Sequence, residues 1–404
     1  MNDRRNRLSE RIFKSDVQRL HVIQWEAVIG KLLRRLELSE EVRAEAEAAY
    51  RRLGDRIAAR LGIGRAQVEV SSQGSMRTQT TVPKRGRTNF DLDIVVRLSG
   101  PKYEGIGAEA LFAEFGKALE GNESATGTPT ARRRCWRLPY PGKPFYFDVT
   151  PAVPDTRRAT GAALKVRDPD TEWSPTNPEE FAVWFCEQAD LHFSFHELLL
   201  KGGFDARGNV APLPNDDVGI RDVLRRLIQL MKLHRDSVYF GATDERKDAQ
   251  PISVILVTLA AQAYQSLWAT SRDQFKSPIE LALAVVEAMP DYIGDRNGQI
   301  WIANPKLGSE NFADKWNLDD GQRRAEFFRW HSHLERDLET LLTGDADVGG
   351  EDRIRAVFGV LGVEAWKAGQ PKTSVLDGLL AAAPGGVTRN PTSPPRSASN
   401  DTLG

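Results

Sequence analysis

Two short stretches of the chain, QGSMRTQTT (residues 73–81) and NFDLDIVV (residues 89–96), decide the fold. The second stretch places Asp91 and Asp93 two residues apart at the start of an apolar run. In a strand this spacing sends both carboxylates to one face, roughly 7 Å apart. Like charges repel there, and Asp is a poor strand former. A divalent cation resolves the conflict, because Mg²⁺ takes carboxylate oxygens together with waters and substrate phosphates.

A third carboxylate is available in the stretch FYFDVTP, residues 145–151. Asp148 is the one acid in this aromatic and apolar stretch, which has the composition of a strand. Three carboxylates can hold two metal ions about 3.5–4 Å apart, one activating a hydroxyl and one stabilising a pyrophosphate leaving group. An Asp-x-Asp pair by itself is also typical of a solvated strand end, so the neighbouring residues must decide.

The Gly-Ser pair that precedes the acids favours the metal interpretation. Residues 68–72 alternate as a strand, Gly74 permits a tight turn, and Ser75 can open a short helix. Backbone N–H groups at such a helix start, together with the Ser hydroxyl, can form a cradle for an anion. A strand, this turn, an Asp-x-Asp strand and a later third Asp together predict a phosphate and metal site that begins at Gln73.

Composition and charge narrow the class of protein. The 404 residues are 40% hydrophobic and 27% charged, which is typical of a globular protein, and a net charge of −1 gives no overall attraction to nucleic acid or membrane. Cys135 and Cys186 have no CxxC spacing, so a cysteine zinc site or disulfide framework is not indicated. The amino terminus lacks an apolar signal core and no eighteen-residue apolar run follows, so we expect a cytoplasmic protein.

The hydrophobic pattern predicts an α+β chain of two lobes. Strands are expected only in about the first 150 residues, and helical periodicity dominates beyond Thr176. We expect a catalytic lobe with a small mixed sheet and long N-terminal helices (1–175), a helical lobe (176–370) and a flexible tail (371–404). The expected helices are 8–36, 39–61, 108–119, 178–188, 220–234, 251–264, 278–288 and 322–342, and the expected strands are 66–72, 90–98, 134–138 and 145–149.

These motifs resemble the polymerase-β-like nucleotidyltransferase superfamily, whose signature is Gly-Ser, Asp-x-Asp and a third acid. Within it, the chain resembles the cGAS/DncV-like nucleotidyltransferases of bacterial anti-phage (CBASS) systems. The matching segments are QGSMRTQT, FDLDIVV, FDVTPAVP, WSPTNP, RDVLRRLIQLMKLHRD and PISVILVTLAAQAY, which together span roughly residues 66–264. The first three are shared by the superfamily, and the later ones point to this family.

The resemblance extends to two residues beyond the acids. In the family, a Lys on one helix of the second lobe and a Ser at the start of the next helix hold the donor triphosphate, and Lys232 and Ser253 stand at the matching places. Lys232 lies off the apolar face of its predicted helix, and Ser253 lies in a first turn whose N–H groups also attract phosphate. From the residues alone, Lys232 is equally a solvated charge and Ser253 an ordinary first-turn residue.

The resemblance implies an enzyme that condenses nucleoside triphosphates, ATP or GTP among them, into a cyclic di- or trinucleotide with release of pyrophosphate. It implies Asp91, Asp93 and Asp148 as ligands of two Mg²⁺ or Mn²⁺ ions, and no stable nucleic-acid or membrane partner. Two alternatives remain at this stage. The chain could transfer a nucleotide to another acceptor, such as an RNA end, a small molecule or a protein, or it could be a catalytically inactive nucleotide sensor.

The carboxyl terminus suggests a further partner. Some members of the family end in a flexible tail whose last Gly or Ala is conjugated to targets by a ubiquitin-ligation-like enzyme. This chain ends Thr402-Leu403-Gly404, and the resemblance therefore implies Gly404 as a possible conjugation point.

Overall fold

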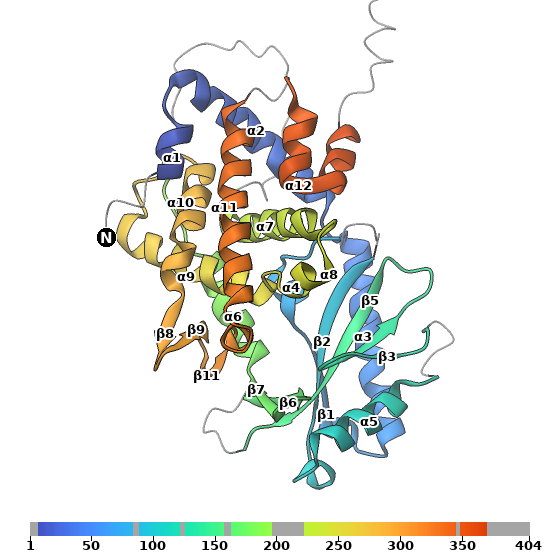
Figure 1. The fold of residues 1–404 in the computed structure, drawn as a ribbon. Coiled ribbons are helices and arrows are strands. Elements are labelled where there is room, and N and C mark those ends of the chain that lie inside the picture. The colour runs from blue at the N-terminus through green and yellow to red at the C-terminus, as the bar shows by residue number, and fades with distance from the viewer. Residues whose placement is uncertain are drawn as a thin grey trace, which may run out of the picture.

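The computed structural model of the chain describes residues 7–83, 89–121, 126–156, 163–195, 222–344 and 348–369. A mixed sheet backed by helices forms one lobe, and a larger bundle of helices forms the other (Figure 1). The two-lobed α+β fold expected from the sequence is confirmed. The proposed tail, with Gly404, lies outside the described residues.

The sheet lobe is organised around two neighbouring parallel strands, β2 and β5. Its seven strands have the order β1-β2-β5-β4-β3, and β6 pairs with β5 and with β7. Every pairing except β2 with β5 is antiparallel, so the sheet is mixed as predicted. The strands are β1 (Val68–Ser72), β2 (Phe90–Leu98), β3 (Thr130–Ala131), β4 (Trp136–Pro139), β5 (Phe145–Pro154), β6 (Leu164–Asp168) and β7 (Glu172–Thr176).

Strand alternation in β2 separates the core from the site. Leu92, Ile94 and Val96 are fully buried in the core that also contains residues of α3 (Glu40–Leu61) and α5 (Ala108–Leu119). In a strand the residues between them project from the opposite face, which is where Asp91 and Asp93 stand. The helices α3 and α5 therefore cover one face of the sheet, and Asp91 and Asp93 lie on the other face.

The helical lobe gathers segments from both ends of the chain. Its core combines α1, α2, α6, α7 and α9 to α12, so the N-terminal α1 and α2 pack here while α3 covers the sheet. The helices of this part are α1 (Arg7–Ile12), α2 (Asp16–Arg35), α6 (Pro178–Ala189), α7 (Val223–Tyr239), α8 (Asp244–Asp248), α9 (Ser253–Ser271), α10 (Pro278–Ala288), α11 (Gln322–Thr343) and α12 (Gly350–Lys367).

Several expected elements differ from the structure. The single helix expected over 8–36 is broken, because the Ser15 hydroxyl accepts the Gln18 N–H and caps a new helix. The expectation that strands end near residue 150 is wrong: β6 and β7 follow, although their polar residues and Pro175 hide the alternation. Four short strands also lie in the helical lobe, β8 (Gly294–Arg296), β9 (Gln299–Trp301), β10 (Ala303–Asn304) and β11 (Leu307–Asn311).

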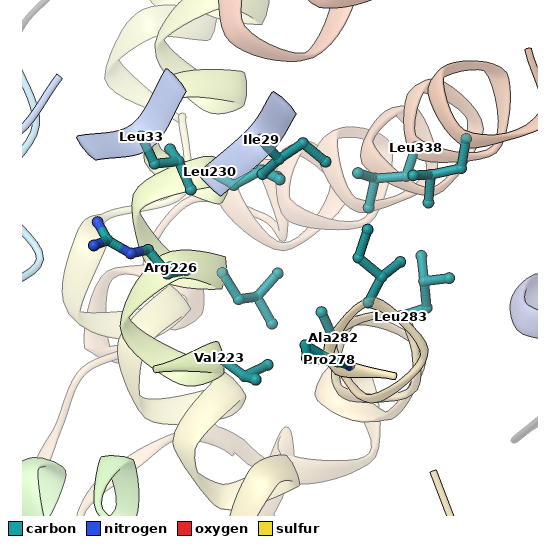
Figure 2. A pocket seen from close by; sticks show the side chains of 12 residues that line it. Ile29, Leu33, Val223, Arg226, Leu230, Pro278, Ala282, Leu283 and Leu338 are labelled. Atoms are coloured by element: carbon teal, nitrogen blue, oxygen red, sulfur yellow. The ribbon is translucent and has the colours of Figure 1, made fainter. Parts of the chain in front are cut away.

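An apolar cavity lies inside the helical lobe, enclosed by α2, α7, α10 and α11 (Figure 2). Its volume is about 50 Å³, far below the roughly 300–1,000 Å³ of most ligand pockets. Arg226 is the charged residue of its lining, and its guanidinium donates to Glu37 and Gln229. This cavity is a packing feature with no suitable partner for a triphosphate.

Among the described helices, none combines the length and apolar character that crossing a membrane requires.

Candidate active site

The three predicted carboxylates come together on the open face of the sheet. In the parallel pairing of β2 with β5, Asp93 stands opposite Asp148, and Asp91 stands opposite Tyr146. Asp91, Asp93 and Asp148 each offer an oxygen, and these three oxygens lie within 4.8 Å of one another. Across the described ranges, no other group of three acidic, His or Cys residues lies as close. The neighbouring strands thus complete the cluster that the sequence predicted.

An arginine that the sequence did not single out stands among these acids. Arg137 in β4 pairs in register with Asp148, and its Nε and Nη2 donate to the two carboxylate oxygens at 2.8 and 2.7 Å. The same Nη2 lies 3.9 Å from Asp91 Oδ2. The guanidinium also stacks over the Tyr146 ring, 4.2 Å from its centroid. One positive charge therefore offsets part of the repulsion among the three carboxylates.

A thiol near the acids remains protonated. Burial raises the pKa of Cys135 to about 12, and the neighbouring Asp148 and Asp93 carboxylates add to the shift. Because only a thiolate is an effective nucleophile, Cys135 has no covalent role at neutral pH.

The Gly-Ser turn reaches the acids through Gly74. This residue opens the short α4 (Gly74–Thr78) with φ +57°, a conformation that side chains disfavour. A Cβ added here would lie 2.6 Å from Asp93 Oδ2. The turn is also fixed to β2, because the Gln73 N–H donates to the Asp93 carbonyl at 2.9 Å. The backbone N–H of Gln73, a predicted phosphate-binding residue, is therefore already engaged within the protein. The Ser75 hydroxyl accepts from Thr81 at 3.4 Å.

Replacing Gly74 with Ala should reduce turnover roughly tenfold, because the new methyl must displace the Asp93 carboxylate, and sub-ångström misplacements of a reacting group are costly. Gly62→Ala is the matched control: Gly62 also has positive φ, but an added Cβ would meet nothing within 4 Å. Both variants should lose stability in thermal unfolding because of the positive φ, Gly74→Ala somewhat more, and only Gly74→Ala should lose activity. Equal activity losses would show that the contact with Asp93 is unimportant.

Lys232 lies at the junction between the lobes and is not a solvated charge. It is 5% exposed in α7, and its Nζ donates to the Thr80 carbonyl at 3.1 Å and to Thr80 Oγ1 at 2.9 Å. Burial, with a smaller contribution from Arg235, lowers the pKa of Lys232 to about 7, although Asp93 and Asp236 act in the opposite direction. This predicted phosphate-binding residue therefore contacts the segment just after the Gly-Ser helix.

Ser253 lies in the first turn of α9 as predicted, although the helix begins at Ser253 rather than at the expected residue 251. Its hydroxyl accepts from Arg235 Nη1 at 2.9 Å, and the same Nη1 donates to the Pro251 carbonyl at 3.2 Å. Arg235 is three residues beyond Lys232 in α7, and its charge also acts on Lys232. The structure thus places Ser253 beside α7, engaged with an arginine that sequence reasoning missed.

The helical lobe also forms hydrogen bonds directly to α4, which was not predicted from the sequence. Arg225 in α7 donates from Nε to the Thr78 carbonyl at 3.1 Å and pairs with Asp222 at 2.8 Å. Thr78 and Thr80 share a hydrogen bond of 2.9 Å between their buried hydroxyls. In the sequence, the feature that could have indicated this junction is the polar run Thr78 to Thr81. Its three threonines are buried, although polar residues after a short helix are usually exposed.

The donor set fits a divalent metal. Three carboxylates supply hard oxygen ligands, no His or Cys is among them, and a cationic guanidinium already stands against two of them. Gly74 leaves room beside Asp93 that a side chain would fill. A metal-dependent site is therefore consistent with the residues present.

The mixed sheet, the Gly-Ser turn and the three acids on adjacent strands are the arrangement that the resemblance to polymerase-β-like nucleotidyltransferases predicts. A family model described as the Second Messenger Oligonucleotide or Dinucleotide Synthetase (SMODS) domain matches residues 25–188, which include the turn and all three acids. Residues 25–188 are thus similar to a synthetase domain of this type, in agreement with the resemblance to the cGAS/DncV-like nucleotidyltransferases that the motifs predicted.

Individual relatives agree with this assignment. The chain is 28% identical over 281 residues to a c-di-GMP synthase of Roseivirga ehrenbergii, covering 69% of each protein. It shares its fold with the CD-NTase CdnG of Bradyrhizobium diazoefficiens, solved in complex with GTP (24% identity, 85% of this chain and 97% of the other, TM-score 0.62). A similar fold occurs in CdnC of Escherichia coli MS115-1, solved in a HORMA complex (12% identity, 83% and 97% coverage, TM-score 0.55).

Proposed function

We propose that the protein joins two nucleoside triphosphates into a cyclic dinucleotide and releases pyrophosphate. The observation that carries this proposal is the cluster of Asp91, Asp93 and Asp148 inside the segment that matches a second-messenger synthetase domain. The similarity to a c-di-GMP synthase makes GTP the first substrate to test, with ATP the second. A cyclic trinucleotide is the other product class that the site would allow.

The chemistry follows from the placement of the residues. Asp91, Asp93 and Asp148 would hold two Mg²⁺ ions, which when bound activate a ribose hydroxyl and neutralise the charge that develops on the leaving group. Gly74 lies beside Asp93, and the Gly74–Ser75 turn would contact the donor triphosphate there. Lys232 and Ser253 would contact that triphosphate from the helical lobe.

Each round of the reaction forms one bond and breaks one. The ribose oxygen of the acceptor bonds to the α-phosphorus of the donor, the bond from that phosphorus to the bridging oxygen breaks, and pyrophosphate leaves. The hydroxyl proton passes to the carboxylate cluster. A second round, in which the remaining triphosphate becomes the donor, closes the ring. Positioning and charge neutralisation supply most of the rate enhancement.

Incubation with nucleotides alone tests the proposal. Purified protein with GTP, ATP, CTP and UTP, singly and in pairs, with Mg²⁺ or Mn²⁺, should yield a phosphatase-resistant product whose mass is that of a cyclic dinucleotide. A nucleotidyltransferase that uses RNA, a small molecule or a protein as acceptor would give no such product from nucleotides alone. An inactive sensor would bind GTP and release no pyrophosphate.

The wider role is also a proposal. We infer from the family that the product serves as a second messenger in cytoplasmic anti-phage defence. Expression in a phage-challenged bacterium should protect cells only when the three acids are intact. Conjugation through Gly404 remains a prediction, and unchanged modification of cellular targets by a chain with a charged residue in its place would exclude it.

A further inference from the structure

The positively charged Arg137 side chain lies among the three carboxylates that are predicted to bind metal ions. Its guanidinium holds both oxygens of Asp148 and lies 3.9 Å from Asp91. The Arg137 and Asp148 side chains are only 20% and 12% exposed, so solvent screens this pair less than a surface ion pair. A metal ion bound by Asp148 would need the same oxygen lone pairs that the two N–H groups now use.

We propose that Arg137 is an internal counter-charge that keeps the nucleotide-free acid cluster closed to metal ions, and that it leaves Asp148 only when a nucleotide arrives with its metal ions. This inference rests on the proposed function and adds an order of events to it. Arg137 acts through Asp148 and is a positioning residue. The protein would then bind divalent ions weakly alone and tightly together with a triphosphate.

The balance of charges at the site supports this link between metal binding and nucleotide binding. The three carboxylates carry three negative charges, and Arg137 offsets one of them. Two divalent ions without nucleotide would bring four positive charges beside a fixed guanidinium, whereas a triphosphate brings about four negative charges with them. The guanidinium therefore repels the ions when they arrive alone, and the negative charge of a triphosphate offsets this repulsion when they arrive with a nucleotide.

The structure also provides a place for the displaced side chain. A hollow of about 720 Å³ adjoins Arg137 and Tyr146 at the edge of β4 and β5, and Arg132 and Lys143 also line it. Tyr146 carries the Arg137 guanidinium on its ring, which offers a surface along which the side chain can turn away from Asp148.

Metal binding by the nucleotide-free protein tests the inference without relying on activity. Mn²⁺ affinity, measured by electron paramagnetic resonance of the free ion, should increase at least about tenfold in Arg137→Gln, because a neighbouring opposite charge alters cation binding by a carboxylate by about ten- to a thousandfold. With a non-hydrolysable GTP analogue present, the difference between variant and wild type should shrink. Arg97→Gln removes a charge from the same sheet, pairs only with Glu69 among the ion pairs found, and should match wild type.

Two further variants keep the outcome decisive. Arg137→Lys retains the charge without the two-pronged bond and should show a smaller gain in Mn²⁺ affinity, which serves as the test if Arg137→Gln does not fold. Equal nucleotide-free affinities in the wild type and the tested variant would overturn the inference, even if wild type makes a cyclic product. Adding Asp93→Asn to Arg137→Gln should abolish the gain; a gain that persists would place the ions elsewhere and contradict the proposed function itself.

Discussion

Asp93→Asn should reduce product formation by at least about a hundred- to a thousandfold while leaving the fold intact, because removal of one electrostatic group from a preorganised site typically costs this much. Asp93 is a better test than Asp148, which also holds Arg137 through two hydrogen bonds. Neutralising Asp93 removes one of three like charges that lie within 4.8 Å, so thermal stability should be unchanged or higher. Initial rates of pyrophosphate release measure the effect.

Glu69→Gln provides the matched control for Asp93→Asn. Glu69 lies in β1 of the same sheet and pairs with Arg97 at 3.2 Å in an exposed position. An exposed ion pair contributes about 0–1 kcal/mol, so this variant should keep both its stability and its rate. Substantial synthesis by Asp93→Asn would contradict the assignment of the acids.

Lys232→Met should reduce kcat/KM about a hundredfold, because a hydrogen bond from a charged group to a buried partner contributes about 1.5–3 kcal/mol. In the proposed mechanism the Lys232 ammonium, which contacts Thr80 in the nucleotide-free protein, contacts the triphosphate, and methionine keeps the length of the side chain without its charge. Lys247→Met, on the 42% exposed Lys247 side chain of α8, is the control and should leave kcat/KM unchanged. Wild-type kinetics in Lys232→Met would remove Lys232 from the site.

The pKa of Lys232 gives this prediction a pH dependence. Because the folded, nucleotide-free pKa is about 7 and the ordinary value is 10.5, the unfolded chain binds more protons between these values. Stability should therefore rise with pH in this window, by up to about 1.4 kcal/mol per unit for this group. Urea unfolding of wild type and Lys232→Met at pH 7 and pH 9 should show the difference, and parallel behaviour of the two proteins would contradict the shift.

Nucleotide binding should raise the pKa of Lys232 and so cause it to take up a proton. A triphosphate stabilises the ammonium, so binding at pH 8 should take up about one proton and should weaken as the pH rises further. Calorimetry in buffers with different ionisation enthalpies measures this uptake. Lys232→Met should bind nucleotide, weakly, without it.

The acid cluster could be predicted because strand periodicity is local information. A spacing of two residues places Asp91 and Asp93 on one face of the strand, and the apolar neighbours Leu92 and Ile94 identify the opposite face as core. Asp148 needed more, since only the parallel pairing of β2 with β5 brings it opposite Asp93. The sequence identified Asp148 as the one acid of a strand-like stretch, and the resemblance to a known family supported its place beside the pair.

Arg137 and Thr80 could not be found in the same way. The contact of Arg137 with Asp148 depends on the register between β4 and β5, and the contact of Thr80 with Lys232 joins residues 152 positions apart from different lobes. The sequence predicted a strand over 134–138, one to two residues off the observed β4, which is enough to leave the register open. Side chains that neutralise a charge cluster are set by such long-range contacts.

A structure with Mn²⁺ and a non-hydrolysable GTP analogue tests the central claim most directly, because anomalous scattering locates the ions independently of the protein atoms. We predict ions bound by Asp91, Asp93 and Asp148, the triphosphate between the Gly74–Ser75 turn and Lys232, and Arg137 turned away from Asp148. Ions located away from these three carboxylates, with the triphosphate bound elsewhere, would contradict it.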